Sequence, residues 1–232
     1  MRVAALELPA RFDRARENLE LTDSLLSRGP CDLALMPEAS LTGYVSPQGD
    51  FDLTRFAESR DGPTSRALAA LAKKHATHLV GPLIERASDG VFNAMIGFDP
   101  AGAEFIHYRK RHPWYPEAWA TPGGNPHPQI RLASRQLRTS VISLAICFDL
   151  HFAEWPQADV LLFPSAWVAK ERDTRLAKLA KLGVNVVNAN WGVGEPRVPG
   201  QGDSMILDAS GKILARAEPG TQRIDAEISA GR

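Results

Sequence analysis

The sequence predicts an α/β or α+β protein in which helices cover a mixed β-sheet. Short apolar runs bounded by turn residues outnumber the segments with helical periodicity, and such runs are typical of buried strands. The predicted helices fall between strands along the chain, so layers of helix and sheet should share one core. With 232 residues and no linker, repeat or low-complexity tract, residues 1–232 are expected to form a single domain.

In the first half of the chain, predicted strands alternate with two predicted helices. Apolar residues recur on one face of residues 12–26, which Gly29-Pro30 follows, and of the segment that begins at Thr64. The turn Ser88-Asp89-Gly90 predicts a hairpin between two of the strands. The strands themselves are predicted at residues 3–8, 32–36, 78–84, 91–98 and 104–108.

Residues 109–128 interrupt this pattern. The segment is basic, rich in aromatic residues and broken by prolines, and an irregular loop with so many large aromatics is expected to carry function. Beyond it, a cationic helix is predicted at residues 170–182, where Gly183 ends it. The strands of the second half are predicted at residues 129–132, 139–146, 159–164, 184–187, 204–208, 212–215 and 224–228.

Composition limits the classes of function. Lys plus Arg and Asp plus Glu both total 27, so the zero net charge favours neither nucleic acid nor an anionic membrane as a partner. No apolar stretch has the length of a signal peptide or a membrane-spanning helix. The two cysteines, Cys31 and Cys147, form no disulfide framework, so a reducing cytoplasm is expected. The six histidines lack ligand spacing, so neither a metal nor another cofactor is expected.

Cys147 is the first candidate for chemistry. It ends an apolar run and is followed at once by Asp149, His151 and the pair Glu154-Trp155, so the strand should stop there. A thiol at a strand end, in a sharp turn, can be approached by a substrate while the sheet holds it rigid, which suits a nucleophile. The alternative is a buried core thiol, because cysteine is among the most buried residue types. His151 is too close in sequence to serve as the usual partner base.

Two further ionisable residues follow apolar strands. Glu38 comes after residues 32–36, and Lys110 comes after residues 104–108. Hydrolysis of an amide by a thiol needs a base that later returns its proton to the departing amine, and a cation or donor pair that holds the oxyanion. A carboxylate and an ammonium group supply these roles without histidine. Taken singly, each residue could instead be a solvated surface charge.

The words around these three residues resemble the signature blocks of the carbon–nitrogen hydrolase, or nitrilase, superfamily, in that family's order. Further blocks agree after them, so the likeness covers nearly the whole chain. The three signature blocks are Pro37-Glu38-Ala39-Ser40-Leu41-Thr42-Gly43-Tyr44, Tyr108-Arg109-Lys110 and Ile146-Cys147-Phe148-Asp149. The later blocks are Pro164-Ser165-Ala166-Trp167, Val187-Asn188-Ala189-Asn190, Gly202-Asp203-Ser204 and Asp208-Ala209-Ser210-Gly211.

The resemblance implies a four-layer α-β-β-α sandwich and a Glu-Lys-Cys triad. Glu38 would be the general base and then the acid, and Cys147 would form a thioester. Lys110 and the backbone N–H of Phe148 would hold the oxyanion. Glu117, on the loop after the lysine, would orient the lysine or the substrate. The resemblance also implies a homodimer.

The expected function is cofactor-free hydrolysis of a small linear amide or N-carbamoyl compound. Tyr44, Trp114 and Trp167 are candidates for the pocket wall, with packing as the alternative role. Nitrile or acyl-transfer chemistry on the same fold is the nearest alternative function, although relatives with nitrilase activity usually carry Cys-Trp-Glu where this chain has Cys147-Phe148-Asp149. A catalytically weak scaffold for protein–protein contact is the alternative from another class.

Overall fold

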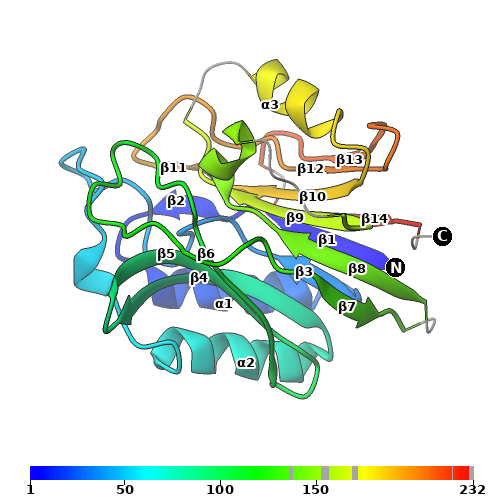
Figure 1. Ribbon diagram of the computed structural model, residues 1–232, viewed down its shortest axis with the longest axis horizontal. Helices are drawn as coiled ribbons and strands as arrows, with labels where there is room; N and C mark the ends of the chain where they lie inside the picture. Colours follow the sequence, from blue (N-terminus) through cyan, green and yellow to red (C-terminus); the bar gives the residue numbers. More distant parts are fainter. Residues whose placement is uncertain (136–137, 153–156, 169–171, 221, 230–232) are drawn as a thin grey trace.

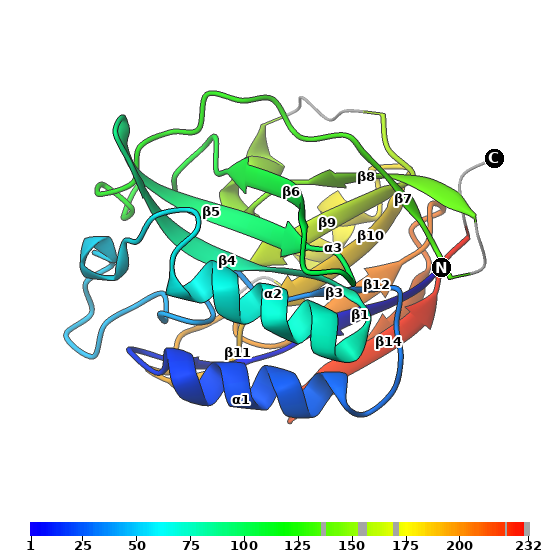
Figure 2. The ribbon, with the colours of Figure 1, turned by 90° about the horizontal axis from the view of Figure 1, so that it is seen from below.

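The computed structural model describes residues 1–135, 138–152, 157–168, 172–220 and 222–229. Two β-sheets stack face to face, and helices lie on the outer side of each sheet (Figure 1). Figure 2, seen from below, shows helices α1 and α2 side by side across the outer face of one sheet. The order of layers is therefore helix, sheet, sheet, helix, and the predicted α-β-β-α sandwich is confirmed.

The first sheet has six strands and mixed direction. Strands β1, β3 and β4 are parallel, and the other pairings are antiparallel. The predicted hairpin is present, because β4 and β5 pair antiparallel up to Ala87 and Gly90. In spatial order the strands are β14 (Arg223–Glu227), β1 (Arg2–Leu6), β3 (Leu33–Leu35), β4 (His78–Ala87), β5 (Gly90–Phe98) and β6 (Glu104–Arg109).

The second sheet repeats this plan. Strands β8, β9 and β10 are parallel at its centre, and antiparallel strands flank them. In spatial order the strands are β13 (Ile213–Arg216), β12 (Met205–Leu207), β10 (Asn185–Asn190), β9 (Val160–Ser165), β8 (Thr139–Leu144) and β7 (Ile130–Ala133). A small parallel pair, β2 (Pro9–Arg11) and β11 (Gly192–Glu195), was not predicted, because segments this short have no alternating apolar pattern.

Three α-helices and two 3₁₀ turns complete the described chain. The helices α1 (Ala15–Leu26) and α2 (Pro63–His75) match the predicted positions, with Pro63 at the favoured start of α2. Helix α3 (Arg172–Leu179) lies inside the predicted range 170–182, whose first two residues are outside the described part. The 3₁₀ turns are η1 (Thr54–Phe56) and η2 (Cys147–His151).

The alternation of side chains along the first sheet separates two cores. Val3 and Ala5 of β1 face the second sheet and join the core between the sheets. Ala4 and Leu6, the residues between and after them, pack with α1 and α2 on the other face. Because both faces are buried, these central strands are apolar throughout, which explains why short continuous apolar runs predicted them.

The parallel strands at the centre of both sheets bring three loops together. Glu38 follows β3, Cys147 follows β8, and Ala166 follows β9. Ligand sites in open α/β sheets commonly form beyond the carboxyl ends of parallel strands. The fold thus positions the predicted reactive residues at one end of the stacked sheets.

Candidate active site

Cys147 lies in a strained turn rather than at the last residue of a strand. Strand β8 ends at Leu144, and Cys147 begins η2 with a φ of +42°, in the left-handed region that non-glycine residues rarely adopt. Strain of this kind is typical of functional turns and is held by surrounding contacts. The predicted sharp turn is therefore present, but the strand ends three residues earlier than its apolar run suggested. The Glu154-Trp155 pair lies outside the described residues.

Asp149 holds the cysteine turn and the lysine segment together. Its fully buried carboxylate accepts hydrogen bonds from the Ile146 backbone N–H at 3.0 Å and from the Tyr108 hydroxyl at 2.9 Å. The backbone N–H of His112 donates to it at 3.0 Å, and the His112 ring contacts it at 2.9 Å. Tyr108 and His112 flank Lys110 by two residues on each side. One carboxylate thus fixes the position of Lys110 relative to Cys147.

Lys110 lies between two carboxylates in the interior. Its Nζ donates to Glu38 Oε1 at 2.7 Å and to Glu117 Oε2 at 2.6 Å, and the three side chains are 0–1% exposed. The backbone N–H of Ala166 donates to Glu38 Oε2 at 2.9 Å. The structure therefore brings together Glu38, Lys110 and Glu117 from three separate segments.

The electrostatics of this cluster follow from burial and pairing. Burial raises the pKa of Glu38, Lys110 lowers it in part, and the charge of Glu117 raises it again. Burial alone would lower the pKa of Lys110, but the charges of Glu38 and Glu117 outweigh it, so the pKa is raised and the ammonium form persists. Lys110 is therefore a permanent cation, and Glu38 is a carboxyl group suited to exchanging a proton.

The thiol of Cys147 is held in its neutral form. Burial raises the pKa of Cys147 well above its usual range, and the charge of Glu38 raises it further, whereas Lys110 and the Ala166 backbone N–H act in the opposite direction. The ammonium group alone would favour a thiolate. Two nearby carboxylates reverse that effect, so deprotonation has to be coupled to a base.

Asn93 and Ala166 belong to the site but were not predicted. Asn93 Nδ2 donates to Glu38 Oε1 at 2.8 Å and to Glu117 Oε1 at 2.5 Å. A polar amide inside the apolar run of β5 was a sequence signal that could have identified Asn93. Ala166 acts through its backbone N–H, which leaves no signal in a side-chain pattern.

Asn190 secures the turn that contains Ala166. Its Oδ1 accepts the Trp167 backbone N–H at 3.0 Å and the Ser165 hydroxyl at 2.9 Å, while its Nδ2 donates to the Gly200 carbonyl at 2.8 Å and the Gly202 carbonyl at 2.7 Å. The turn after β9 is thereby fixed to the end of β10, and the N–H that faces Glu38 is held with it.

The predicted aromatic residues lie close to this cluster. Tyr44 is buried and stacks on Trp114, with ring centroids 6.3 Å apart, and Trp191, which was not predicted, packs edge-on against Tyr44. The backbone N–H of Trp114 donates to Glu117 Oε2 at 2.5 Å. Burial raises the pKa of Tyr44 well above its usual range, as do the charges of Glu38 and Glu117, so its hydroxyl stays neutral.

Phe148 and Trp167 surround the other side of the cysteine turn. Phe148 follows Cys147 directly, and its ring lies 4.9 Å from the ring of His151. His151 in turn stacks on Trp167 at 5.9 Å. The Lys178 ammonium lies 2.8 Å from His151 Nδ1, and burial, together with Lys178, lowers the pKa of His151. His151 is thus engaged away from the thiol, in agreement with its rejection as the base.

Arg109, next to Lys110, points to the opposite face of the sheet. Its guanidinium contacts both oxygens of Glu85 at 2.8 and 2.9 Å, and His107 contacts the same carboxylate at 2.8 Å. Burial opposes ionisation of Glu85, but His107 and Arg109 outweigh it and lower the pKa to about 2. Strand alternation therefore assigns Arg109 to a structural ion pair and Lys110 to the site.

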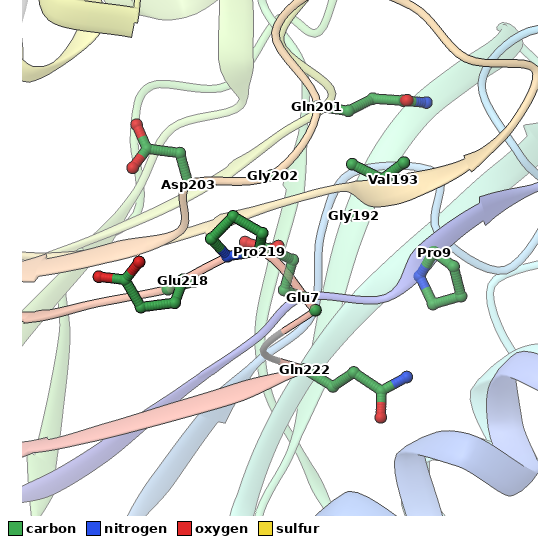
Figure 3. Close-up of a pocket in the computed structure, with 12 residues that line it drawn as sticks. Glu7, Pro9, Gly192, Val193, Gln201, Gly202, Asp203, Glu218, Pro219 and Gln222 are labelled. Carbon is green, nitrogen blue, oxygen red and sulfur yellow. The ribbon is translucent and has the colours of Figure 1, made fainter.

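A separate cavity of about 150 Å³ lies near the end of β1 and the start of β11. Glu7, Gln201, Asp203 and Glu218 are among the residues that line it (Figure 3). Asp203 is ion-paired with Arg175 and Arg216, and Glu7 Oε2 accepts the Ser204 backbone N–H at 2.8 Å. None of the predicted catalytic residues lines this cavity.

Two searches of the described residues concern metals and membranes. No group of three or more His, Cys, Asp or Glu side chains there is arranged to hold a metal ion. Within the same residues, no helix is long and apolar enough to cross a membrane.

The sandwich and the buried Glu-Lys-Glu cluster beside a cysteine define a class of protein that comparison with known families identifies. A family model described as carbon-nitrogen hydrolase matches residues 2–232. The chain therefore belongs to the carbon–nitrogen hydrolase family, as its sequence blocks indicated.

Named relatives in this family include hydrolases and amidases. The "hydrolase in pqqF 5′ region" of Pseudomonas protegens is 29% identical over 72% of this chain and 59% of its own length. The omega-amidase YafV of Yersinia enterocolitica is 27% identical over 99% of this chain and 90% of its own length. A formamidase from Bradyrhizobium is 29% identical over 94% of this chain, which spans 62% of that relative.

Solved structures share the fold. NitN amidase from Nesterenkonia superimposes with a TM-score of 0.84 at 22% identity, covering 99% of this chain and 93% of that one. A CN-hydrolase superfamily protein from Xanthomonas campestris, solved with an arsenic adduct in its active site, gives a TM-score of 0.82 at 23% identity, covering 99% and 91%. The four-layer architecture is thus that of known carbon–nitrogen hydrolases.

Proposed function

We propose that this protein hydrolyses the carbon–nitrogen bond of a small linear amide or N-carbamoyl compound through a thioester on Cys147. The products are a carboxylic acid and ammonia or an amine. The observation that carries the proposal is the buried Lys110, which lies within 2.7 Å of both Glu38 and Glu117 beside a thiol in a strained turn. Perturbed ionisable groups grouped in this way are typical of catalytic sites.

In the proposed reaction, Glu38 takes the proton of the Cys147 thiol as the sulfur attacks the carbonyl carbon. Because the pKa values of Glu38 and Cys147 are both raised, the proton can pass between them without a free thiolate in the resting enzyme. Lys110 and the Phe148 backbone N–H stabilise the oxyanion. Glu38 then gives the proton to the departing nitrogen, and the C–N bond breaks to leave the thioester.

Water completes the cycle. Glu38 accepts a proton from water, whose oxygen attacks the thioester carbonyl, and the C–S bond breaks to release the acid and restore the thiol. Glu117 stays hydrogen-bonded to Lys110 Nζ and to the Trp114 backbone N–H throughout, and keeps the ammonium group in place. Tyr44, Trp114 and Trp167 wall the pocket for the substrate.

The wider proposal is a single domain over residues 1–232 that acts as a cytoplasmic homodimer on small molecules. One core between the sheets contains residues from β1 through β14, which supports the single domain. The dimer rests on the family resemblance, and the cytoplasm rests on two buried free cysteines. Light scattering coupled to gel filtration tests the dimer, which is expected at twice the mass of 25.3 kDa.

The test is ammonia release from small amides and N-carbamoyl compounds. The names of the omega-amidase and formamidase relatives support including formamide and the ω-amides of dicarboxylic acids in this set. We expect release by the wild type, none by Cys147→Ala, and normal release by Cys31→Ala, whose thiol is buried in the separate core beneath α1 and α2. Turnover that survives in Cys147→Ala would refute the thioester.

The alternatives predict other results in the same set. A nitrilase or acyl-transfer enzyme would act on a nitrile, or on an amide only when a second nucleophile is supplied. A scaffold protein would release nothing, and its Cys147 would react with iodoacetamide as slowly as Cys31. Solved structures of the Nesterenkonia amidase carry acrylamide and fluoroacetamide adducts at the active-site cysteine, which makes small amide electrophiles suitable probes.

A further inference from the structure

Asn93, in the middle of β5, connects the two carboxylates of the site. Its single amide nitrogen donates to Glu38 Oε1 at 2.8 Å and to Glu117 Oε1 at 2.5 Å, and the residue is 1% exposed. Its backbone oxygen accepts the Lys110 backbone N–H at 2.8 Å. One residue therefore contacts all three members of the Glu-Lys-Glu cluster.

The orientation of this amide is set by charge. A rotated amide would place Oδ1 against two carboxylate oxygens, so only the nitrogen can face them. In the observed orientation Oδ1 has no hydrogen-bond partner within the described part of the chain, although it is buried. A buried acceptor without a partner destabilises the fold, and its neighbours on β5 are apolar, so packing does not call for an amide here.

The distribution of donors separates the roles of the carboxylates. Oε2 of Glu117 accepts from Lys110 Nζ and the Trp114 N–H, and Asn93 occupies Oε1. Glu38 receives Lys110 and Asn93 on one oxygen and the Ala166 N–H on the other. Of the three donors to Glu38, Asn93 is the one that also contacts Glu117 without carrying a charge.

We propose that Asn93 is a positioning residue that holds Glu38 and Glu117 at a fixed separation and favours the ionised, proton-accepting form of Glu38. The role of Glu38 as base rests on the proposed function. Asn93 does not touch the reacting atoms, and it acts through Glu38. Its removal should leave substrate binding intact and weaken proton transfer.

The test is the rate of Cys147 alkylation by iodoacetamide as a function of pH, followed by mass spectrometry of the Cys147 peptide. Alkylation needs Glu38 in its ionised form, so the rate should rise as pH rises through the pKa of Glu38. Because Asn93 stabilises that form, Asn93→Ala should move this limb about one unit to higher pH. At a fixed pH below the limb, labelling should be about tenfold slower.

A matched control uses a buried amide that also bridges two acceptors. Asn185 Nδ2 donates to the Asp159 and Ser229 backbone oxygens at the opposite end of β10. Asn185→Ala should destabilise the fold but leave the alkylation limb in place. If Asn93→Ala does not fold, Asn93→Leu, which fills the space without a donor, is measured in the same way.

Steady-state kinetics give a second readout. Asn93→Ala should lower kcat by about 10²-fold, as expected for a misplaced base, while KM changes little. A limb that coincides with that of the wild type overturns the proposal, even if turnover falls. If the limb shifts while the wild type hydrolyses no amide, the positioning role stands and the proposed function fails.

Discussion

At the scale of single residues, Lys110 determines the charge of the site. Its ammonium group is completely buried and is the only cation that contacts Glu38 and Glu117 in the described residues. With the thiol neutral, the cluster carries one net negative charge. Removing one partner of a buried ion pair leaves an uncompensated charge, which destabilises proteins by about 3–5 kcal/mol.

Lys110→Met should therefore lose about 3–5 kcal/mol of the free energy of unfolding at pH 7, along with turnover. In this variant the pKa of Glu38, already above its ordinary value of 4.5, rises further because Lys110 no longer lowers it. A raised folded-state pKa means that stability is present at low pH and is lost as pH rises. Lowering the pH from 7 to 5 should thus restore part of the stability of Lys110→Met relative to the wild type.

Urea denaturation at both pH values measures this effect. Lys74→Met is a suitable control, because the Lys74 side chain is 59% exposed where it pairs with Asp23. That change should cost at most about 1 kcal/mol. Equal stability of the two variants at pH 7 would show that Lys110 does not compensate the buried carboxylates.

At the scale of elements, the position of the thiol depends on the contact between η2 and the lysine segment. Asp149 of η2 accepts hydrogen bonds from Tyr108 of β6 and from His112 beyond it. Burial and the charge of Asp149 raise the pKa of Tyr108, so its hydroxyl remains a donor. Two elements that share no strand pairing are thus connected by one carboxylate.

Asp149→Asn should cost about 3 kcal/mol or more, because several donors lose an ionised acceptor in a buried position. It should also lower kcat, since Lys110 and Cys147 lose their common anchor. Tyr108→Phe removes one of these hydrogen bonds and should cost only about 1 kcal/mol. Thermal melts and steady-state kinetics of both variants measure this order, and wild-type kcat in a folded Asp149→Asn would contradict the anchoring role.

Elements also show what the sequence could and could not predict. The central strands were predicted because burial on both faces makes them apolar throughout. The end of β8 was placed too late, since Ala145 and Ile146 are apolar and buried yet already belong to the turn. The β2–β11 pair was missed because its contacts depend on tertiary structure rather than on local pattern.

At the scale of the whole molecule, the site exists because the two sheets stack with their parallel strands side by side. Glu38 and Lys110 belong to the first sheet, whereas Cys147 and Ala166 belong to the second. The sequence blocks predicted the residue types, and the fold brings Glu38, Lys110 and Glu117 into direct contact. Asn93, Ala166 and Asn190 could not be predicted in the same way, because their contributions depend on the distance between segments.

The most direct test of the thioester uses two substrates with one acyl group, a primary amide and its N-methyl amide, in the presence of hydroxylamine. Both should pass through the same acyl group on Cys147, so the ratio of hydroxamate to acid should be identical for the two leaving groups. Cys147→Ala should form neither product. Ratios that differ between the two substrates would contradict a common thioester, and with it the proposed role of Cys147.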